Sequence, residues 1–247
     1  MTFILRGLVI SIGLLLCWQT SVTFSHLPNY ILPSPSQVLL TLYQQSHLIA
    51  VQTLPTLLET LLGFLFGIVL GCLAGFMLAF SRPVAFWFLP ILIISQAIPT
   101  FAIAPLLVIW LGYGLSSKIA TTLLMIFFPV TSAFYDGLRR TPPAWLDLAK
   151  TMNGKKWPIF WHIQLPAALP TLASGIRIAA VIAPIGAIVG EWVGSSEGLG
   201  YLMLNANARL QIDMMFAALL VIIWLALSLY FSVDRLLRLL IWWQGND

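Results

Sequence analysis

Three ionisable side chains lie inside long apolar segments of the sequence, where a charge must be either paired or functional. They are Glu59, Arg177 and Glu191. An ionisable group is costly away from water, so such a residue usually faces an opposite charge or a hydrated path. This leaves two hypotheses for Glu59: it lines a pathway for a solute, or it pairs with a basic residue near one end of its segment.

The other two charges lie near opposite ends of one apolar segment. Glu191 comes just before the sequence GSSEGLG, where it acts either at a gate or docking surface or as a hydrated helix end. Arg177 lies near the start of the segment, where a long basic side chain can reach the membrane surface by extending along apolar neighbours.

The apolar segments lack the residues that an enzymatic reaction inside them would need. The histidines His26, His47 and His162 all lie in polar connections, so none can serve a nucleophile within an apolar segment. The phosphate-binding glycine-rich motif of ATPases is missing. Cys17 and Cys72 lack the spaced partners of a disulfide framework or a zinc site. We therefore expect no catalytic residue, metal or cofactor.

A proline-containing apolar segment, 95–114, supplies further polar and aromatic side chains. Its Pro99 and Pro105 free backbone carbonyl groups, which is typical of helices that line a cavity or bend. Together with Glu59 and Glu191, the candidate pathway residues are Gln96, Thr100, Trp110 and Tyr113. Packing is the alternative role for the tryptophan.

Membrane-spanning helices must position these residues. Hydrophobic residues make up 60% of the 247 residues and charged residues only 8%, and the mean hydropathy is +0.97. A span needs about 20 apolar residues and is helical because lipid offers the backbone no partner. We predict an all-α polytopic membrane protein with six spans, at about 7–25, 53–80, 85–110, 117–137, 169–193 and 213–234.

Glycines recur at four-residue spacing in the second predicted span. This pattern lets two helices approach closely, so we expect it to serve helix packing rather than a ligand. The glycines are Gly63, Gly67, Gly71 and Gly75.

The basic residues predict the orientation, since cytoplasmic connections are enriched in Lys and Arg. One set of connections carries nine of them: Arg6, Arg82, Arg139, Arg140, Lys150, Lys155, Lys156, Arg235 and Arg238. The opposite set carries two, Lys118 and Arg209. Both termini are therefore expected in the cytoplasm.

The long outer connection, 26–52, starts with prolines that prevent a helix. Ser36 then has the character of an N-cap. The apolar face of the predicted helix carries Val38, Leu39, Leu42 and Tyr43. We expect this amphipathic helix to lie along the outer membrane surface.

The long inner connection, 138–168, is too polar to span the membrane and too apolar for a flexible linker. It predicts a short helix around 147–152, a turn at Asn153-Gly154, and a second short helix over 157–164. Exposed aromatic residues on such a helical knob favour docking of a partner, whereas an aromatic belt at the membrane surface is the alternative.

At this connection the sequence resembles the permease subunits of binding-protein-dependent ABC importers. Their loop carries Glu-Ala-Ala, three residues and Gly, followed later by Leu-Pro. Asp147-Leu148-Ala149, Asn153 and Leu165-Pro166 occupy these positions here. Asp keeps the charge of Glu, and Asn tolerates the left-handed conformation of Gly, so the turn should survive.

The resemblance implies that 138–168 is a coupling loop, between spans four and five, that docks on a cytoplasmic ATPase. The residues that it assigns to ATPase coupling are Asp147, Ala149, Asn153, Gly154, Trp157, Phe160, Trp161, Leu165 and Pro166. The aromatic side chains would anchor the knob, Asp147 would cap or brace the first helix, and the prolines would keep the loop stiff.

Three further stretches resemble the nitrate, sulfonate and taurine type of these permeases: LPSPSQV, LPAALPTLASGIRIA and GEWVGSSEGLGYL. The segment IAPLLVIWLGYGLSSKI is similar to the branch for thiamine-precursor pyrimidines and riboflavin. The sulfonate branch usually has Arg at the position of Glu59, and an acidic pathway residue suits an anion poorly. A neutral or weakly basic heteroaromatic compound, such as an aminomethyl-pyrimidine, is therefore the expected solute, with taurine, sulfonates and nitrate as the alternative.

The resemblance divides the chain into 1–52, the first span and outer segment, 53–237, the transmembrane domain, and 238–247, a cytoplasmic tail. It implies a homodimer in the bacterial inner membrane, a pair of ATPases, a periplasmic solute-binding protein and no nucleic acid. An intramembrane enzyme, a channel and a secondary transporter are the rival classes. A channel would show charged rings and many secondary transporters an inverted repeat. Neither is visible in the sequence.

Overall fold

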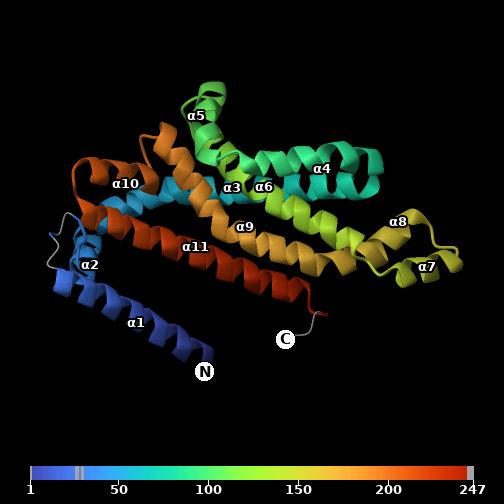
Figure 1. Ribbon diagram of the computed structural model, residues 1–247, viewed down its shortest axis with the longest axis horizontal. Coiled ribbons are helices and arrows are strands. Elements are labelled where there is room, and N and C mark those ends of the chain that lie inside the picture. Colours follow the sequence, from blue (N-terminus) through green and yellow to red (C-terminus); the bar gives the residue numbers. More distant parts are fainter. Residues whose placement is uncertain (1, 26–27, 29–30, 244–247) are drawn as a thin grey trace.

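The computed structural model describes residues 2–25, 28 and 31–243, and the secondary structure of these residues is helical throughout. Four long helices run side by side along the longest axis (Figure 1). They are α3 (Ser46–Phe80), α6 (Leu115–Arg139), α9 (Leu165–Gly194) and α11 (Ile212–Leu240). The core lies where α6 packs between α3 and α9, and α11 covers the other side of α9.

The glycine ladder of α3 packs against α6, as predicted. A Cβ added to Gly71 would lie 2.8 Å from the side chain of Val130, and one added to Gly75 would lie 2.9 Å from the carbonyl oxygen of Thr131. Only glycine allows the two helices this separation. The close contact fixes the register of α3 on α6, and with it every residue pair that the two helices share.

Four helical segments are long and apolar enough to cross a membrane in the described chain: 46–80, 115–139, 156–194 and 212–240. They coincide with the second, fourth, fifth and sixth predicted spans. The first predicted span lies within α1 (Thr2–Ser25), which packs beside α2, and its crossing of the bilayer stays a prediction.

The predicted third span is two helices rather than one. α4 (Arg82–Ala97) and α5 (Thr100–Leu111) meet at a bend of 102°. Ile98 is extended, with φ −85° and ψ 120°, because the ring of Pro99 excludes the helical conformation from the preceding residue. A hydropathy profile does not detect such a break, so the sequence of 85–110 predicts one continuous span.

The outer amphipathic helix, α2 (Pro35–Gln44), has its N-cap two residues before the predicted one. Ser34 is the N-cap, and its hydroxyl accepts a hydrogen bond from the Gln37 N–H, while Pro35 takes the first helical position. The assignment of the cap to Ser36 was therefore wrong. Val38 is fully buried, but Leu39 and Tyr43 of the predicted apolar face are exposed.

The inner connection forms a knob at one end of the bundle (Figure 1). It contains α7 (Pro143–Thr151), α8 (Lys156–Ile159) and a π-helical turn, η1 (Phe160–Gln164), that leads directly into α9. Helix continues without a break from Lys156 to Gly194, so the second predicted short helix, 157–164, runs directly into the fifth predicted span. The wider π-turn just before Pro166 keeps the chain helical where proline removes a donor.

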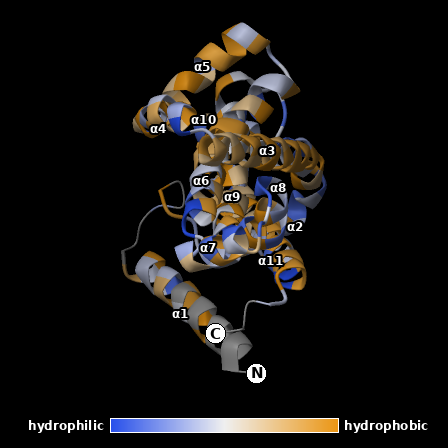
Figure 2. Cartoon of the chain, turned by 90° about the vertical axis from the view of Figure 1, so that its right-hand side faces the viewer, coloured by the Kyte–Doolittle hydropathy of each residue, from blue (hydrophilic) through white to orange (hydrophobic). Residues whose placement is uncertain are grey.

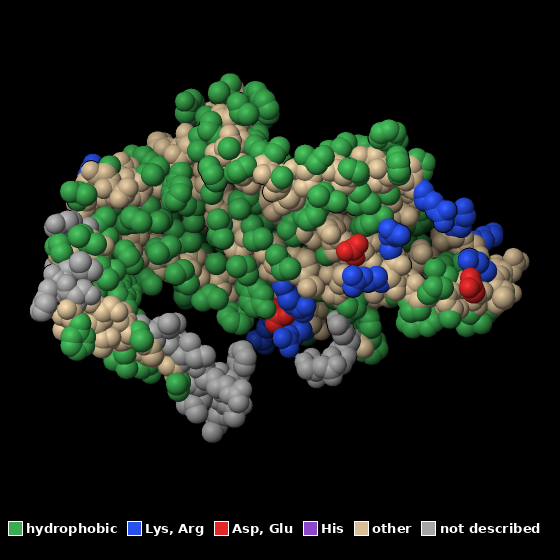
Figure 3. Space-filling view, in the orientation of Figure 1, with side chains coloured by type: hydrophobic (Ala, Val, Ile, Leu, Met, Phe, Trp, Pro, Cys, Tyr) green, Lys and Arg blue, Asp and Glu red, His purple; other side chains and the backbone are tan. Residues whose placement is uncertain are grey.

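The two ends of the molecule differ in surface charge. Lys and Arg side chains gather on the half that carries the knob, and few appear at the opposite end, which carries α10 (Leu199–Ala208) (Figure 3). Seen from the knob end, hydrophobic colour dominates α3 and α5, whereas hydrophilic residues concentrate in α7 and α8 (Figure 2).

Candidate functional site

Glu59 is paired across the bundle. The Nζ atom of Lys118 lies 2.7 Å from Oε1 of Glu59, and both side chains are at most 6% exposed. The hypothesis of a basic partner is thus confirmed, and the partner is now identified. The second carboxylate oxygen, Oε2, is buried and has no hydrogen-bond partner among the described residues. Glu59 therefore keeps one unused acceptor next to its ion pair.

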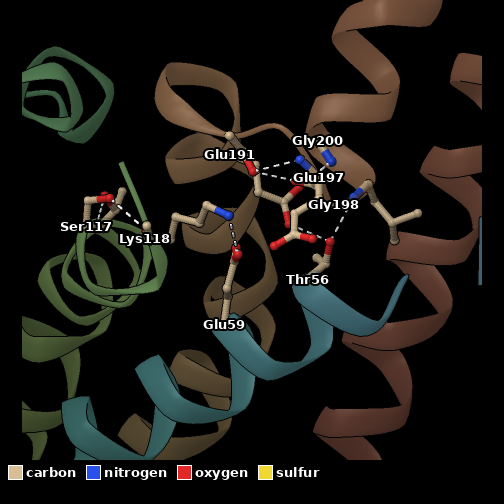
Figure 4. Close-up of polar contacts among 12 residues, drawn as sticks. Thr56, Glu59, Ser117, Lys118, Glu191, Glu197, Gly198 and Gly200 are labelled. Atoms are coloured by element: carbon tan, nitrogen blue, oxygen red, sulfur yellow. Dashed lines mark hydrogen bonds and ion pairs between the residues drawn. The ribbon is translucent and has the colours of Figure 1, made fainter. Parts of the chain in front are cut away.

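Lys118 was missing from the sequence-based site because it was assigned to a polar connection. α6 begins at Leu115, so Lys118 lies in its first turn and points toward α3 (Figure 4). One feature of the sequence does point to Lys118: it and Arg209 are the only Lys or Arg residues in the predicted outer connections.

Glu191 is buried rather than hydrated, being 1% exposed, so the hypothesis of a hydrated helix end is wrong. Its Oε1 accepts a hydrogen bond of 2.5 Å from the Thr56 hydroxyl, and its Oε2 accepts one of 2.5 Å from the Gly200 N–H (Figure 4). The carboxylate thereby joins α3, α9 and the first turn of α10. A negative charge at a helix N-terminus is favourable because of the helix dipole.

Two side chains of α3 complete this capping arrangement. The Leu199 N–H donates to Thr56 Oγ1 over 2.8 Å, and the Gly198 N–H donates to Gln52 Oε1 over 2.6 Å. Gly198 has φ +106°, and a Cβ there would overlap the Glu191 carboxylate. The first N–H groups of α10, which a helix cannot satisfy itself, are thus taken by side chains of two other helices.

The ion pair of Glu59 and Lys118 and the Glu191 carboxylate lie at a cavity of about 980 Å³ close to α10. Its wall includes Glu59, Lys118 and Glu191 together with three aromatic side chains, Tyr113, Trp192 and Tyr201. Of the four oxygens of these two buried carboxylates, only Glu59 Oε2 has no hydrogen-bond partner among the described residues. No group of three or more His, Cys, Asp and Glu side chains in the described part of the chain is placed to hold a metal ion.

The other pathway candidates divide between the cavity and the outer surface. Tyr113 lines the cavity, but Gln96, Thr100 and Trp110 do not. Trp110 is 69% exposed on α5, so packing inside this chain is not its role. The bend between α4 and α5 carries this part of the chain away from the bundle (Figure 1).

The knob ends its first helix with the predicted turn. Asn153 has φ +60°, its N–H donates to Lys150 O, and the Gly154 N–H donates to Ala149 O. This is the Schellman arrangement, in which a left-handed residue closes a helix end. A Cβ on Gly154 would lie 2.7 Å from Ala149 O, so the second residue of the turn also has to be small.

The aromatic residues of the knob have two different placements. Trp157 and Trp161 are 59% and 57% exposed, whereas Phe160 is only 3% exposed. The Phe160 ring packs 5.2 Å from Phe76 and 5.0 Å from Phe80, measured between ring centroids. Phe160 therefore joins the knob to α3 from inside and is not presented to a partner.

The remaining coupling residues lie on or beside α7. Asp147 forms an exposed ion pair of 3.0 Å with Lys150, so it braces α7 and does not cap it. Ala149 and Pro166 line an apolar groove of about 610 Å³ between α7 and the start of α9. Leu165 packs against the buried core around Phe160.

Residues 63–241 match the protein family described as "Binding-protein-dependent transport system inner membrane component". A "Probable ABC transporter permease protein" of Haemophilus influenzae is 56% identical over 97% of this chain and 98% of its own length. The riboflavin transport system permease protein RibX of Chloroflexus aurantiacus is 37% identical, over 97% and 91% of the two chains. The formylaminopyrimidine transport permease protein ThiX of Halalkalibacterium halodurans is 34% identical, over 95% and 94%.

The fold is similar to that of a solved transporter. An inward-facing structure of the MetNI methionine ABC transporter superposes with a TM-score of 0.64, at 23% identity, over 74% of this chain and 92% of that chain.

Proposed function

This chain belongs to the family of binding-protein-dependent transport system inner membrane components and is the permease subunit of an ABC importer; starting from that, we propose that its solute is a neutral or weakly basic heteroaromatic compound such as an aminomethyl-pyrimidine. The observation that carries this proposal is the composition of the cavity wall, which combines buried carboxylates with aromatic rings.

The chemistry of the wall favours a flat solute with N–H groups. Tyr113, Trp192 and Tyr201 offer ring faces for stacking, and a cationic or polarised ring gains further from their negative faces. Glu59 offers its unpartnered Oε2 atom as an acceptor for an N–H donor. The one cation in the wall, Lys118, is already paired with Glu59, so an anionic solute meets no free positive charge there.

The names of the relatives are compatible with such a solute. ThiX is described as a formylaminopyrimidine permease and RibX as a riboflavin permease, and both solutes contain nitrogen heterocycles. Taurine, sulfonates and nitrate are the alternative, and they differ by carrying a negative charge without an aromatic ring.

The proposed assembly is a homodimer in the bacterial inner membrane, with ATPase subunits at the knob and a solute-binding protein at the α10 end. The basic side chains gathered on the knob half support a cytoplasmic position for that end (Figure 3). A cytoplasmic position of both termini is part of the same proposal. The half-exposed Trp157 and Trp161 offer the kind of aromatic anchor found at interface hot spots.

Uptake competition tests the solute. Cells that express the complete transporter would take up labelled aminomethyl-pyrimidine, and unlabelled taurine, nitrate and riboflavin would be added as competitors. We expect competition by heterocycles and none by the anions. The Glu59→Gln variant should raise the KM, while Glu197→Gln, on the exposed loop of the same cavity wall, should not. Uptake of taurine or nitrate in place of the pyrimidine would overturn the proposal.

Co-purification tests the knob. The chain would be purified in detergent together with the co-expressed ATPase, as wild type and with Trp157 and Trp161 both replaced by Ser. We expect the double variant to lose the ATPase and still to insert. The matched control replaces Trp242, an 80% exposed tryptophan outside the knob, and should retain the ATPase. Equal retention by all three proteins would place the docking surface elsewhere.

A further inference from the structure

A cluster of arginines lies at the knob end of α9 and α11, away from the cavity. Asp234 of α11 accepts from Nε of Arg177 over 2.7 Å and from Nε of Arg238 over 2.8 Å. Arg177 thus pairs with another helix while remaining 28% exposed. Figure 3 shows a compact group of basic side chains around an acidic one over the end of α11.

This arginine patch, which consists of Arg177, Arg235 and Arg238 around Asp234, carries surplus positive charge. The guanidinium groups of Arg177 and Arg238 share the Asp234 carboxylate, whose two oxygens are both engaged through Nε atoms. Arg235, the next residue along α11, adds a third positive charge. Within the described part of the chain, no hydrogen-bond or ion-pair partner takes the terminal guanidinium nitrogens of Arg177 and Arg238, or any nitrogen of Arg235. The patch therefore presents several donors and no free acceptor.

The surroundings of the patch place it at the edge of an apolar surface. Ile223, Leu227 and Phe231 are 46%, 49% and 56% exposed on the part of α11 that precedes the patch, and Trp242 follows the patch at 80%. Exposed apolar side chains of a spanning helix face lipid tails, and tryptophans mark the level of lipid headgroups. The arginine heads thus lie at the depth where phospholipid phosphates lie.

We propose that the arginine patch binds the phosphate of an anionic phospholipid headgroup, with the acyl chains lying along the exposed apolar side chains of α11 that precede the patch. Guanidinium groups match phosphate oxygens with paired hydrogen bonds, and a net positive charge at this depth selects anionic over zwitterionic lipid. Free phosphate shares the headgroup chemistry but gains nothing from these apolar side chains. The proposal requires only that α11 crosses a bilayer, and it does not depend on the solute.

Lipid titration of the full-length chain tests the patch. The protein would be delipidated in detergent and titrated with phosphatidylglycerol, phosphatidylcholine or glycerol phosphate, and bound lipid would be counted by native mass spectrometry. The double variant Arg235→Gln/Arg238→Gln should bind phosphatidylglycerol roughly tenfold more weakly, because each basic residue near the surface contributes separately. The control Lys155→Gln/Lys156→Gln removes the same charge from the knob and should bind as wild type does.

A third variant covers the case of a folding defect. Asp234→Asn removes the only carboxylate of the patch, so it should bind phosphatidylglycerol more tightly than wild type. Equal binding of phosphatidylglycerol and phosphatidylcholine by wild type would overturn the proposal, as would unchanged phosphatidylglycerol binding by a folded double variant. Saturation by glycerol phosphate that displaces the lipid would assign the patch to a soluble phosphate compound instead.

Discussion

The two ends of the bundle treat charge in opposite ways. At the α10 end, Glu59, Lys118 and Glu191 are at most 5% exposed, and each side chain bonds to a residue on a helix other than its own. Within the knob itself, Asp147 and Lys150 are 70% and 67% exposed and bond only to each other within α7. Charge at the α10 end cross-links helices, whereas charge in the knob forms a surface.

The α10 end and the knob are held in place by different kinds of contact. The α10 end is held by polar contacts between helices, because a buried charge without a partner is strongly unfavourable. The knob is held by apolar contacts of Phe160 with α3 and by the backbone turn at Asn153. Polar contacts thus join the helices at the cavity, whereas the knob leaves its charges exposed.

Lys118→Met should have the largest effect on stability. Removing one partner of a buried ion pair costs about 3–5 kcal/mol, because the remaining charge keeps its desolvation penalty. We expect a clear loss of thermal stability in detergent, largely recovered in Lys118→Met/Glu59→Leu. Lys150→Met, at the exposed pair, is the matched control and should change little. Equal melting of both single variants would mean that the Glu59 pair is hydrated like the knob.

Phe160→Ala should come next and should act on the knob alone. Truncating a buried Phe to Ala lowers the free energy of unfolding by about 3–5 kcal/mol. We expect a value near the lower limit, because the neighbouring Trp157 and Trp161 are half-exposed. We expect faster hydrogen exchange over residues 143–164 with unchanged exchange in α10. Trp161→Ala is the control, because its side chain is already half in solvent. Faster exchange in both regions would show that the two ends unfold as one unit.

Features with a local signature could be predicted from the sequence. The glycine ladder and the Asn153 turn follow from spacing and from the conformational range of single residues, and the structure confirms both. The pairing of Glu59 with Lys118 joins residues 59 positions apart. It depends on the register of α3 on α6, which no local pattern encodes.

The inward position of Phe160 escaped prediction for a related reason. The knob looked like an independent element, since its prolines and turn mark boundaries in the sequence. The π-turn makes it continuous with α9, and this rotates Phe160 toward α3. The capping of α10 by Glu191 and Thr56 was hidden as well, because both acceptors come from other helices.

Asn153→Val should have a smaller effect that isolates the turn. A left-handed conformation costs roughly 1–2 kcal/mol for an ordinary residue, and a β-branched side chain resists it further. We expect faster exchange at the C-terminal end of α7 and weaker co-purification with the ATPase. Asn153→Gly should retain both properties, since glycine adopts positive φ without strain. If valine were tolerated as well as glycine, the turn would have no part in positioning the knob.

Lys150→Gln should have the smallest effect of the four variants, and it tests the exposed ion pair of the knob. An exposed ion pair three residues apart on a helix contributes about 0.2–0.5 kcal/mol, and salt screens it. Stability should therefore stay within error at moderate salt. If Lys150 lies on the docking surface, ATPase co-purification should fall more than stability does, and Asp147→Asn measured in parallel would separate the effect of charge sign from that of the pair. A loss of stability equal to that of Lys118→Met would contradict the idea that the knob uses its charges as a surface.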